Sequence, residues 1–302
     1  MMVKDLTSKA PLAFVGLGAI GLPIAANLLK AGFDLKVHTR SRTAETNEKL
    51  AGAKPCSSAR DAAKDTNILL ICVSDENAVD DVLFGSQGAE SNLNKGNIVI
   101  DLSTITPEKA KYFSEKLAKK GVTYVDAPVS GGTEGAKAGT LTIFLGANNK
   151  TLKEIECILK SIANSIYPFG KTGKGQEVKA LNQVLVAGTY AAVAEAIALG
   201  QELLLPMDLV VEALQKGAAS SWALTNRSES MLKDDYPLGF KLELHHKDLC
   251  IALKTAESVG LQLPVTFKVK ELEEELLQEG YHSMDVSILR RSIKRRQMTD
   301  ER

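Results

Sequence analysis

The sequence predicts an α/β domain followed by an all-helical domain, and three observations support this prediction. Short apolar runs alternate with helical patterns from residue 12 to residue 168, and after that point only helical patterns appear. Between the two regions lies the segment 173–205, which begins with glycines, contains almost no helix breaker and ends before Pro206. At about 1.5 Å per residue, such a helix is roughly 45 Å long, so we expect it to join two domains.

Length and composition indicate a soluble two-domain protein. The chain has 302 residues, and the 37 Lys and Arg residues balance the 37 Asp and Glu residues. At about 150 residues per domain this length predicts two domains, and the charge balance argues against nucleic acid as a partner. The four cysteines lie far apart without a CxxC spacing, which is typical of free thiols in a reducing compartment. We therefore expect a cytoplasmic protein.

Membrane and metal functions are not predicted. The N-terminus lacks a signal-peptide pattern, and polar residues interrupt the most apolar stretch, 180–199. The four histidines show no ligand spacing with acids or cysteines, so no metal site is expected.

The first predicted strand leads into a glycine motif. Residues 12–16 form an apolar run, GLGAIG follows, and a helical pattern continues to Gly32 before a second predicted strand, LKVHT, at 35–39. G-x-G-x-x-G between a strand and a helix is the fingerprint of a dinucleotide-binding (Rossmann) domain, because the backbone can approach a pyrophosphate and the helix start attracts its charge. The predicted cofactor-binding residues of this loop are Gly16, Leu17, Gly18, Ala19, Ile20 and Gly21.

The end of the second strand indicates which dinucleotide binds. An NAD site usually has an acidic residue about 20 positions after the glycines. Here Thr39, Arg40, Ser41 and Arg42 occupy that position. Two cations and two hydroxyls suit a 2′-phosphate, so NADP is favoured over NAD. An exposed basic loop without a ligand is the alternative.

The alternation of strands and helices continues to residue 168. We predict helices near 43–51, 58–64, 107–121 and 150–162, and strands at 68–73, 98–102, 124–126, 141–145 and up to Pro168. Thr106 is predicted to cap a helix that has Pro107 at its first position. Ligands bind at the carboxyl ends of parallel strands, which makes Val73, Ser74 and Thr104 cofactor candidates. A helix cap explains Ser74 and Thr104 equally well.

A glycine-rich segment, APVSGGTEGAKAGTL, follows Asp126. We predict it to be a loop in which Ser130 and the N–H groups of Gly131 and Gly132 can bind a carboxylate. A flexible linker is the alternative interpretation.

The second domain is predicted to be all-helical. It combines the long helix 173–205 with helical segments near 208–216, 220–232, 242–260, 265–280 and 284–296, separated by glycines and prolines. The domains are predicted to comprise residues 10–172 and 173–296, with residues 297–302 as a tail. The C-terminal sequence RRSIKRRQMTDER is basic, and we expect it to be a solvated end.

Two polar residues stand out near the start of the long helix. Its surface is apolar nearly all round, so we expect it to be buried on most sides. Against this background Lys179 and Asn182, spaced i, i+3, share one face, where a cleft between two domains would lie.

Three motifs in a fixed order resemble those of the β-hydroxyacid dehydrogenase family. They are GLGAIG at 16–21, DAPVSGG at 126–132 and G-x-G-x-x-x-K-x-x-N at 173–182. The resemblance covers roughly residues 10–295. It implies a Rossmann domain, a long helix and an all-α domain, and an NAD(P)-dependent oxidoreductase that acts on a small carboxylate-bearing semialdehyde or hydroxy acid.

The resemblance also implies roles for individual residues. Lys179 would be the catalytic lysine, with Asn182 orienting the substrate and Ser130, Gly131 and Gly132 holding its carboxylate. In HHKDLCIAL, Lys247 would lie near the cofactor and Asp248 near the substrate. Phe240 falls where semialdehyde reductases have a pocket aromatic residue.

We therefore predict a glyoxylate or succinic semialdehyde reductase that uses NADP(H) and forms a homodimer or homotetramer. The loop sequence CVSDEN lacks the Leu-Pro pair of many 3-hydroxyisobutyrate dehydrogenases, but an NAD-dependent enzyme of that kind remains an alternative. A lysine that forms a Schiff base, and an inactive dehydrogenase-like assembly module, are further alternatives.

Overall fold

The computed structural model describes residues 11–293. Residue 10 of the predicted first domain, residues 294–296 of the second and the predicted tail 297–302 lie outside the described residues. The chain divides into two compact units between Lys179 and Ala180. We refer to them as unit 1 and unit 2.

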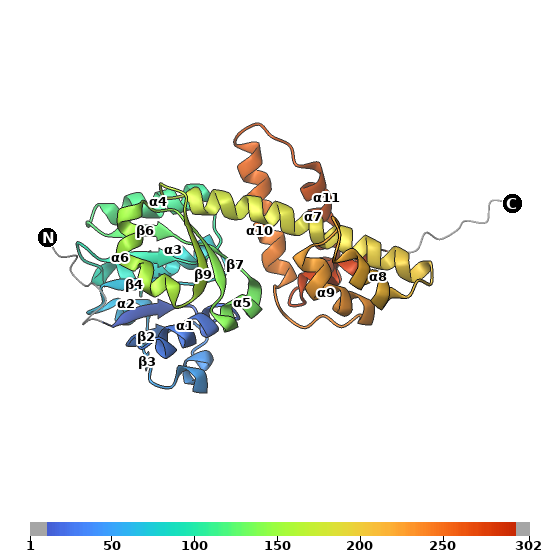
Figure 1. Cartoon of the computed structure of the whole chain (residues 1–302). Coiled ribbons are helices and arrows are strands. Elements are labelled where there is room, and N and C mark those ends of the chain that lie inside the picture. Colours follow the sequence, from blue (N-terminus) through green and yellow to red (C-terminus); the bar gives the residue numbers. More distant parts are fainter. Residues whose placement is uncertain (1–10, 294–302) are drawn as a thin grey trace. The chain divides into compact units, whose positions relative to one another are not determined.

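Unit 1 contains a six-stranded, fully parallel sheet (Figure 1). Its strand order is β3-β2-β1-β4-β5-β6, the order of a Rossmann fold, so the predicted fold class is confirmed. The strands are β1 (Leu12–Val15), β2 (Leu35–His38), β3 (Lys54–Pro55), β4 (Ile68–Ile71), β5 (Ile98–Asp101) and β6 (Thr123–Asp126).

Helices cover both faces of this sheet. Alternate residues of one strand, such as Phe14 and Val15 in β1, point into two separate hydrophobic clusters. Because both faces are buried, β1, β4 and β5 are nearly continuous apolar runs, which is why the sequence revealed them. The helices are α1 (Gly21–Lys30), α2 (Ala59–Ala63), α3 (Glu76–Phe84), α4 (Pro107–Ala118), α5 (Gly132–Ala138) and α6 (Asn149–Lys160).

A second sheet has the order β7-β8-β9 and includes part of the glycine-rich segment. β7 (Val129–Ser130) is antiparallel to β8 (Leu141–Leu145), and β8 is parallel to β9 (Ala163–Pro168). The prediction of a loop after Asp126 was therefore wrong, because this segment forms β7 and α5. Glycine has a low intrinsic propensity for both structures, and long-range packing overrides it here.

The segment after β2 also differs from the prediction. In place of one helix at 43–51, two short 3-10 helices occupy Thr43–Thr46 and Glu48–Leu50.

Unit 2 comprises most of the long helix and the helices that follow it. Ala187, Tyr190, Ala194 and Ile197 of the long helix α7 (Lys174–Glu202) line one side of the unit 2 core. The other helices are α8 (Met207–Leu214), α9 (Trp222–Lys233), α10 (Leu242–Glu257) and α11 (Pro264–Gln278). The predicted helix at 284–296 is a 3-10 helix over Val286–Ser292.

The long helix is less buried than its composition predicted. Only 44% of its most apolar stretch is buried, and Leu199 is 60% exposed. By length and composition alone α7 could cross a membrane, a property it shares with core helices of soluble proteins. The expectation of burial on most sides was wrong, because an apolar pattern around a helix does not reveal which neighbours will cover it.

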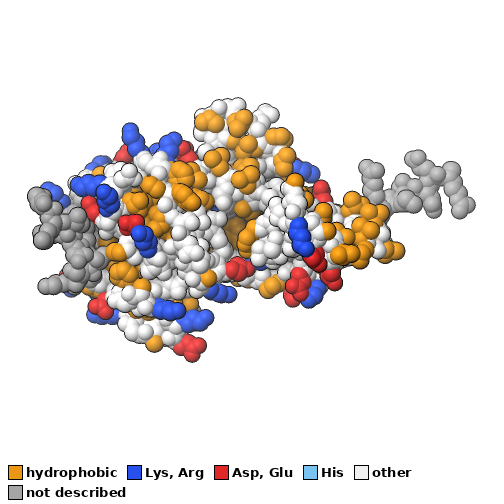
Figure 2. All heavy atoms as spheres, in the orientation of Figure 1, with side chains coloured by type: hydrophobic (Ala, Val, Ile, Leu, Met, Phe, Trp, Pro, Cys, Tyr) orange, Lys and Arg blue, Asp and Glu red, His pale blue; other side chains and the backbone are white. Residues whose placement is uncertain are grey.

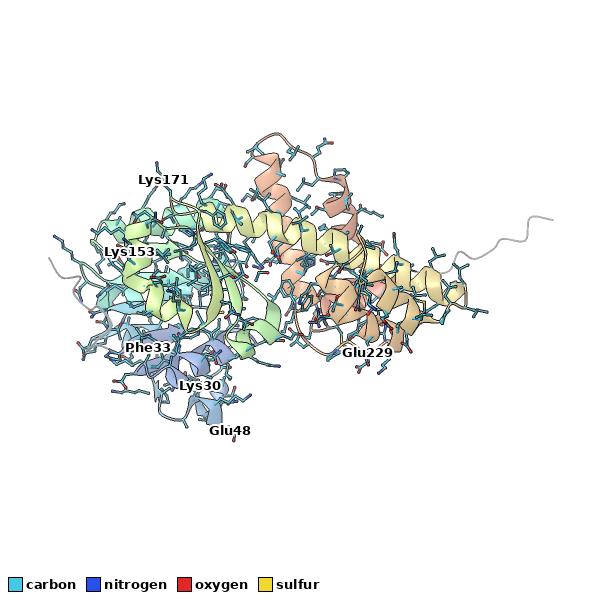
Figure 3. All side chains as sticks on the ribbon, in the orientation of Figure 1. Lys30, Phe33, Glu48, Lys153, Lys171 and Glu229 are labelled. Atoms are coloured by element: carbon cyan, nitrogen blue, oxygen red, sulfur yellow. The ribbon has the colours of Figure 1, made fainter. Side chains whose placement is uncertain are left out.

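One exposed apolar area of unit 2 lies at the end of α7 and over α8. Leu203, Leu204 and Leu209 are 60%, 90% and 63% exposed there. Figure 2 shows this apolar area near α8. Charged side chains such as Lys153 and Lys171 in unit 1 point outward from the ribbon instead (Figure 3).

Candidate functional site

The glycine loop after β1 has the geometry that a dinucleotide requires. Gly16 has φ +102°, and a Cβ there would lie 2.1 Å from the carbonyl oxygen of Cys72. A Cβ on Gly21 would lie 1.9 Å from the carbonyl oxygen of Gly16. Gly18 is exposed and borders open space, and no side chain caps the start of α1 after Ile20. The loop therefore fits a pyrophosphate that approaches the backbone at the helix start.

Hydrogen bonds connect the loops that follow the carboxyl ends of neighbouring strands. The N–H of Leu17 donates to Thr39 Oγ1 at 3.4 Å, which connects the glycine loop to the loop after β2. The N–H of Val73 donates to Ser103 Oγ at 3.0 Å, which connects the loops after β4 and β5. Most of the predicted cofactor residues of unit 1 lie on these loops, where Thr39 is half-buried and Arg40 and Ser41 are exposed.

A buried glutamate holds the loop after β2. Glu45 is only 5% exposed, and its carboxylate accepts the N–H of Thr39 at 2.9 Å and Nε of Arg42 at 2.8 Å. Arg42 has φ +64° and is thereby turned toward Glu45. The sequence indicated Arg40 and Arg42 as two cations for a phosphate, but Arg42 is bound to Glu45. Arg40 is therefore the more suitable cation for a ligand.

The predicted cap at Ser74 was wrong. Asp75 is the N-cap of α3, since its Oδ1 accepts the N–H groups of Asn77 and Ala78 at 3.0 and 2.9 Å. Ser74 is exposed and donates to Asp75 Oδ2 at 2.6 Å. The cap at Thr106 is confirmed, with Pro107 at the first helical position.

Ser130, Gly131 and Gly132 lie at the junction between β7 and α5. Gly131 (φ +128°) and Gly132 (φ +61°) have conformations that favour glycine, and α5 begins at Gly132. Because Asn27 of α1 donates to the carbonyl oxygen of Ala136 at 2.8 Å, α5 is fixed to the helix that follows the glycine loop.

Lys179 lies near the start of α7 and is only 6% exposed. One turn earlier, Gln176 is 1% exposed and bonds to the loop after β5. Its Nε2 donates to the carbonyl oxygen of Ser103 at 2.9 Å, and its Oε1 accepts the N–H of Ile105 at 3.2 Å. The start of α7 is thus attached to the edge of the sheet that carries the glycine loop.

Two buried acids lie at the ends of β5 and β6. Burial raises the pKa of Asp101 to about 6, although Tyr124 donates to its Oδ2 at 2.6 Å and the N–H of Ser103 donates to its Oδ1 at 2.9 Å. Burial also raises the pKa of Asp126, against the opposing effect of backbone N–H groups of α7.

In unit 2, four polar side chains form a continuous chain. Asn182 Nδ2 donates to Gln183 Oε1 at 2.7 Å, and Gln183 Nε2 donates to Asp248 Oδ2 at 2.7 Å. Lys247 Nζ lies 2.9 Å from the other oxygen of Asp248. Three of the predicted residues are therefore brought together by Gln183, which is 1% exposed.

Phe240 contacts Asp285 and His245. Its N–H donates to Asp285 Oδ2 at 2.8 Å, and its ring meets the His245 ring edge-on with centroids 5.4 Å apart.

Sequence reasoning missed Glu45, Asp126, Gln176 and Gln183. Asp126 had a signal, since it begins DAPVSGG. The amides of Gln176 and Gln183 were a usable signal too, because polar residues on an apolar helix need buried partners.

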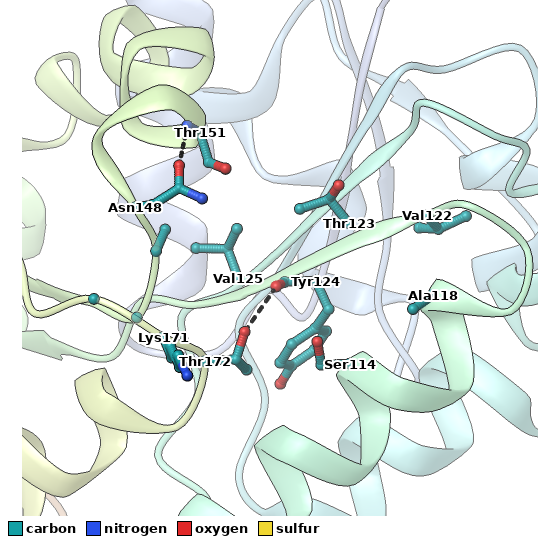
Figure 4. Close-up of a pocket in the computed structure, with 13 residues that line it drawn as sticks. Ser114, Ala118, Val122, Thr123, Tyr124, Val125, Asn148, Thr151, Lys171 and Thr172 are labelled. Carbon is teal, nitrogen blue, oxygen red and sulfur yellow. Dashed lines mark hydrogen bonds between the residues drawn. The ribbon is translucent and has the colours of Figure 1, made fainter.

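A hollow of about 430 Å³ in unit 1 contains none of the predicted site residues. It lies beside β6, and in Figure 4 Thr172 Oγ1 donates to the carbonyl oxygen of Tyr124 across it. Within residues 11–293, no group of three or more His, Cys, Asp or Glu residues could hold a metal ion.

Comparisons with known proteins agree with this architecture. Residues 11–170 match the family model for the NAD-binding domain of 6-phosphogluconate dehydrogenase. Residues 173–293 match the model described as NAD-binding of NADP-dependent 3-hydroxyisobutyrate dehydrogenase.

Individual relatives cover almost the whole chain. 2-Hydroxy-3-oxopropionate reductase of Escherichia coli (strain K12) is 36% identical over 92% of this chain and 95% of its own length. The structure of a 3-hydroxyisobutyrate dehydrogenase from Salmonella typhimurium is similar, with a TM-score of 0.86, 28% identity and coverage of 94% of this chain and 100% of that one. A structure titled Psf3 in complex with NADP⁺ and 2-OPP has a TM-score of 0.88, 25% identity and the same coverage.

The raised pKa of Asp101 predicts a pH dependence of stability. In the folded state the carboxyl holds its proton up to about pH 6, and in the unfolded state only up to its ordinary value of 3.8. The free energy of unfolding therefore falls as pH rises from 4 to 6, by about 3 kcal/mol for this group alone. In Asp101→Asn, the side-chain amide can accept a hydrogen bond from the N–H of Ser103 and donate one to the Tyr124 oxygen. Because the amide does not ionise, the free energy of unfolding does not fall with pH at this position. We expect the variant to gain stability relative to the unaltered protein between pH 4 and pH 7, measured by urea unfolding. An equal stability difference at both pH values would contradict the prediction.

Proposed function

We propose that this chain, which belongs to the β-hydroxyacid dehydrogenase family, reduces small carboxylate-bearing semialdehydes with NADPH. It is an NAD(P)-dependent dehydrogenase or reductase that acts on CH–OH groups. The observation that best supports the proposal is the buried Lys179, on a helix whose start is bonded through Gln176 to the carboxyl edge of the Rossmann sheet. Ligands bind at this edge in such folds.

Lys179 is proposed to handle the proton. A bound nicotinamide supplies or accepts the hydride. When a carbonyl is reduced, its oxygen gains negative charge, and an ammonium beside it stabilises the charge and donates a proton. In the direction of oxidation, the neutral amine accepts the proton from the hydroxyl. The low exposure of Lys179 strengthens this electrostatic effect, because water screens it less.

The other predicted residues are proposed to hold the substrate and cofactor. Ser130 and the N–H groups of Gly131 and Gly132, at the start of α5, are suited to a carboxylate. Asn182 is proposed to orient the reacting oxygen, and the chain through Gln183 to Asp248 fixes its amide. We propose that Lys247 contacts the cofactor and that Phe240 shapes the substrate pocket.

NADP is the proposed cofactor. The loop after β2 has the exposed cation Arg40 beside Thr39 and Ser41. The acid in this region, Glu45, is buried and occupied by Thr39 and Arg42, so it is poorly placed to accept ribose hydroxyls. NAD remains the alternative cofactor.

Glyoxylate or succinic semialdehyde is the proposed substrate. A second candidate is 2-hydroxy-3-oxopropionate, because the 36% identical relative from Escherichia coli is named for reducing it. We also propose a cytoplasmic homodimer or homotetramer. The exposed Leu203, Leu204 and Leu209 support association, which light scattering of the purified protein measures directly.

A substrate panel tests the function. The purified protein is assayed with glyoxylate, succinic semialdehyde, 2-hydroxy-3-oxopropionate and methylmalonate semialdehyde, each with NADPH and with NADH. We expect the highest kcat/KM with NADPH and one of the first two compounds. A higher kcat/KM with 2-hydroxy-3-oxopropionate would make that compound the assigned substrate. A kcat/KM more than about 100-fold higher with NADH than with NADPH would contradict the assignment of NADP as the cofactor. If no compound is reduced, the inactive assembly module becomes the better interpretation.

Replacement of Lys179 tests the catalytic role. Lys179→Ala removes the proton donor, so kcat should fall at least about 10³-fold while the Kd of NADPH, measured by fluorescence, stays within about twofold. Lys174→Ala, an exposed lysine on the first turn of the same helix, is the matched control and should retain kcat. A Lys179→Ala enzyme with more than a tenth of the normal kcat would exclude the role.

Replacement of Arg40 tests the cofactor site. Arg40→Ala should raise the Kd of NADPH by about 10–100-fold and change that of NADH less than about threefold, because only NADPH carries the 2′-phosphate. Lys49→Ala, an exposed cation in the following 3-10 helix, serves as the charge control. Equal weakening of both cofactors by Arg40→Ala would argue against a phosphate contact.

A further inference from the structure

The carboxylate of Asp126 connects the last strand of the sheet to the start of α7. Asp126 ends β6 and has no exposed surface. Its Oδ1 accepts the N–H of Gly173 at 2.8 Å, and its Oδ2 accepts the N–H of Gln176 at 3.0 Å. These N–H groups belong to the beginning of the helix, which has no earlier turn to bond them. A residue 47 positions before Gly173 therefore caps this helix.

Two glycines make room for the carboxylate. A Cβ on Gly146 would lie 1.9 Å from Asp126 Oδ1, and a Cβ on Gly175 would lie 2.8 Å from its Oδ2. A Cβ on Gly175 would also lie only 2.3 Å from the carbonyl oxygen of Phe144. The segment after β8 and the first turn of α7 thus enclose Asp126, which leaves no space for a longer side chain.

The same turn has a second attachment. Gln176, whose N–H binds Asp126, uses its side chain to bind Ser103 and Ile105 in the loop after β5. Two neighbouring strands, β5 and β6, therefore fix one turn of α7 from both sides. Lys179 lies three residues after Gln176, about one turn along the same helix. The bonds that fix the first turn therefore also fix the direction from which Lys179 projects.

We propose that Asp126, supported by Gln176, is a positioning residue for Lys179. It acts through the helix start and not by contact with the reacting atoms. This inference rests on the proposed function, in which Lys179 is the catalytic acid. A carboxylate is required because two N–H donors need two acceptor oxygens. In Asp126→Asn one oxygen becomes an NH₂ group that faces an N–H donor, so the turn must shift.

The test uses Asp126→Asn in the full-length protein. A displacement of the catalytic group by about 1 Å can cost about 100-fold in rate, so we expect kcat to fall by about 10–100-fold. The Kd of NADPH should stay within about twofold. Because the chemical step is slowed, the isotope effect on kcat with NADPH deuterated at the transferred position should increase. Amide hydrogen exchange of the peptide 173–180 should become faster, a readout that does not depend on activity.

Two further variants separate positioning from general loss of stability. Asn148→Ala removes the N-cap of α6, whose Oδ1 accepts the N–H of Thr151 at 2.9 Å. It should lower the urea concentration at the unfolding midpoint without changing kcat. Gln176→Met removes both side-chain bonds to the loop after β5 while keeping the length of the side chain. It should lower kcat in the same way as Asp126→Asn.

The outcomes are distinguishable. If the unaltered protein reduces a substrate but kcat of Asp126→Asn and Gln176→Met stays within twofold of it, the positioning role is excluded and the proposed function stands. An equal loss of kcat in Asn148→Ala would also exclude the role, because stability alone would then explain the loss. If the unaltered protein turns over no substrate, the proposed function fails first and the inference fails with it.

Discussion

The link between β6 and α7 depends on one buried carboxylate. Burial disfavours the charge of Asp126 and raises its pKa, and backbone N–H groups at the start of a 29-residue helix offset part of that cost. The partial positive charge of a helix N-terminus is concentrated on these N–H groups, so an acid is well suited to cap them. Because Gln176 joins the same turn to the loop after β5, the sheet edge is bonded to the start of α7 within unit 1 through both strands.

This attachment explains why glycines recur in two distant parts of unit 1. Gly16 and Gly21 allow β1, α1 and the loop after β4 to approach closely, and Gly146 and Gly175 allow the backbone to approach Asp126. In each case the constraint is a backbone or carboxylate oxygen at less than 3 Å from where a Cβ would be. Glycine therefore serves two kinds of close approach: it lets backbone pack against backbone beside α1, and it admits a capping carboxylate beside α7.

The sequence predicted the fold well because its signals are local. Apolar runs located β1, β4 and β5 of the parallel sheet, and the glycine motif located the first turn. The two-residue, exposed β3 was not predicted, because it has no apolar pattern. The errors arose where long-range packing decides. α5 forms in a glycine-rich segment because it packs on α1. The N-cap of α3 is Asp75 and not Ser74, because both residue types are good caps and local preference does not decide between neighbouring positions. The exposure of Leu199 could not be read from a helix that is apolar all round.

The candidate site shows the same division between local and long-range information. Motifs pointed to Lys179 and Asn182 as candidates, but the acids that anchor their surroundings, Asp126 and Asp248, come from elsewhere in the chain. The amide chain in unit 2 illustrates why. A carboxylate only accepts hydrogen bonds, so Asp248 obliges Gln183 to donate through Nε2 and to accept through Oε1. Asn182 must then donate to Gln183 through Nδ2, which fixes the direction of its own amide. Asp248, which lies 66 residues further along the chain, thus determines that Asn182 points its Nδ2 toward Gln183. No pattern of spacing near Asn182 contains that information.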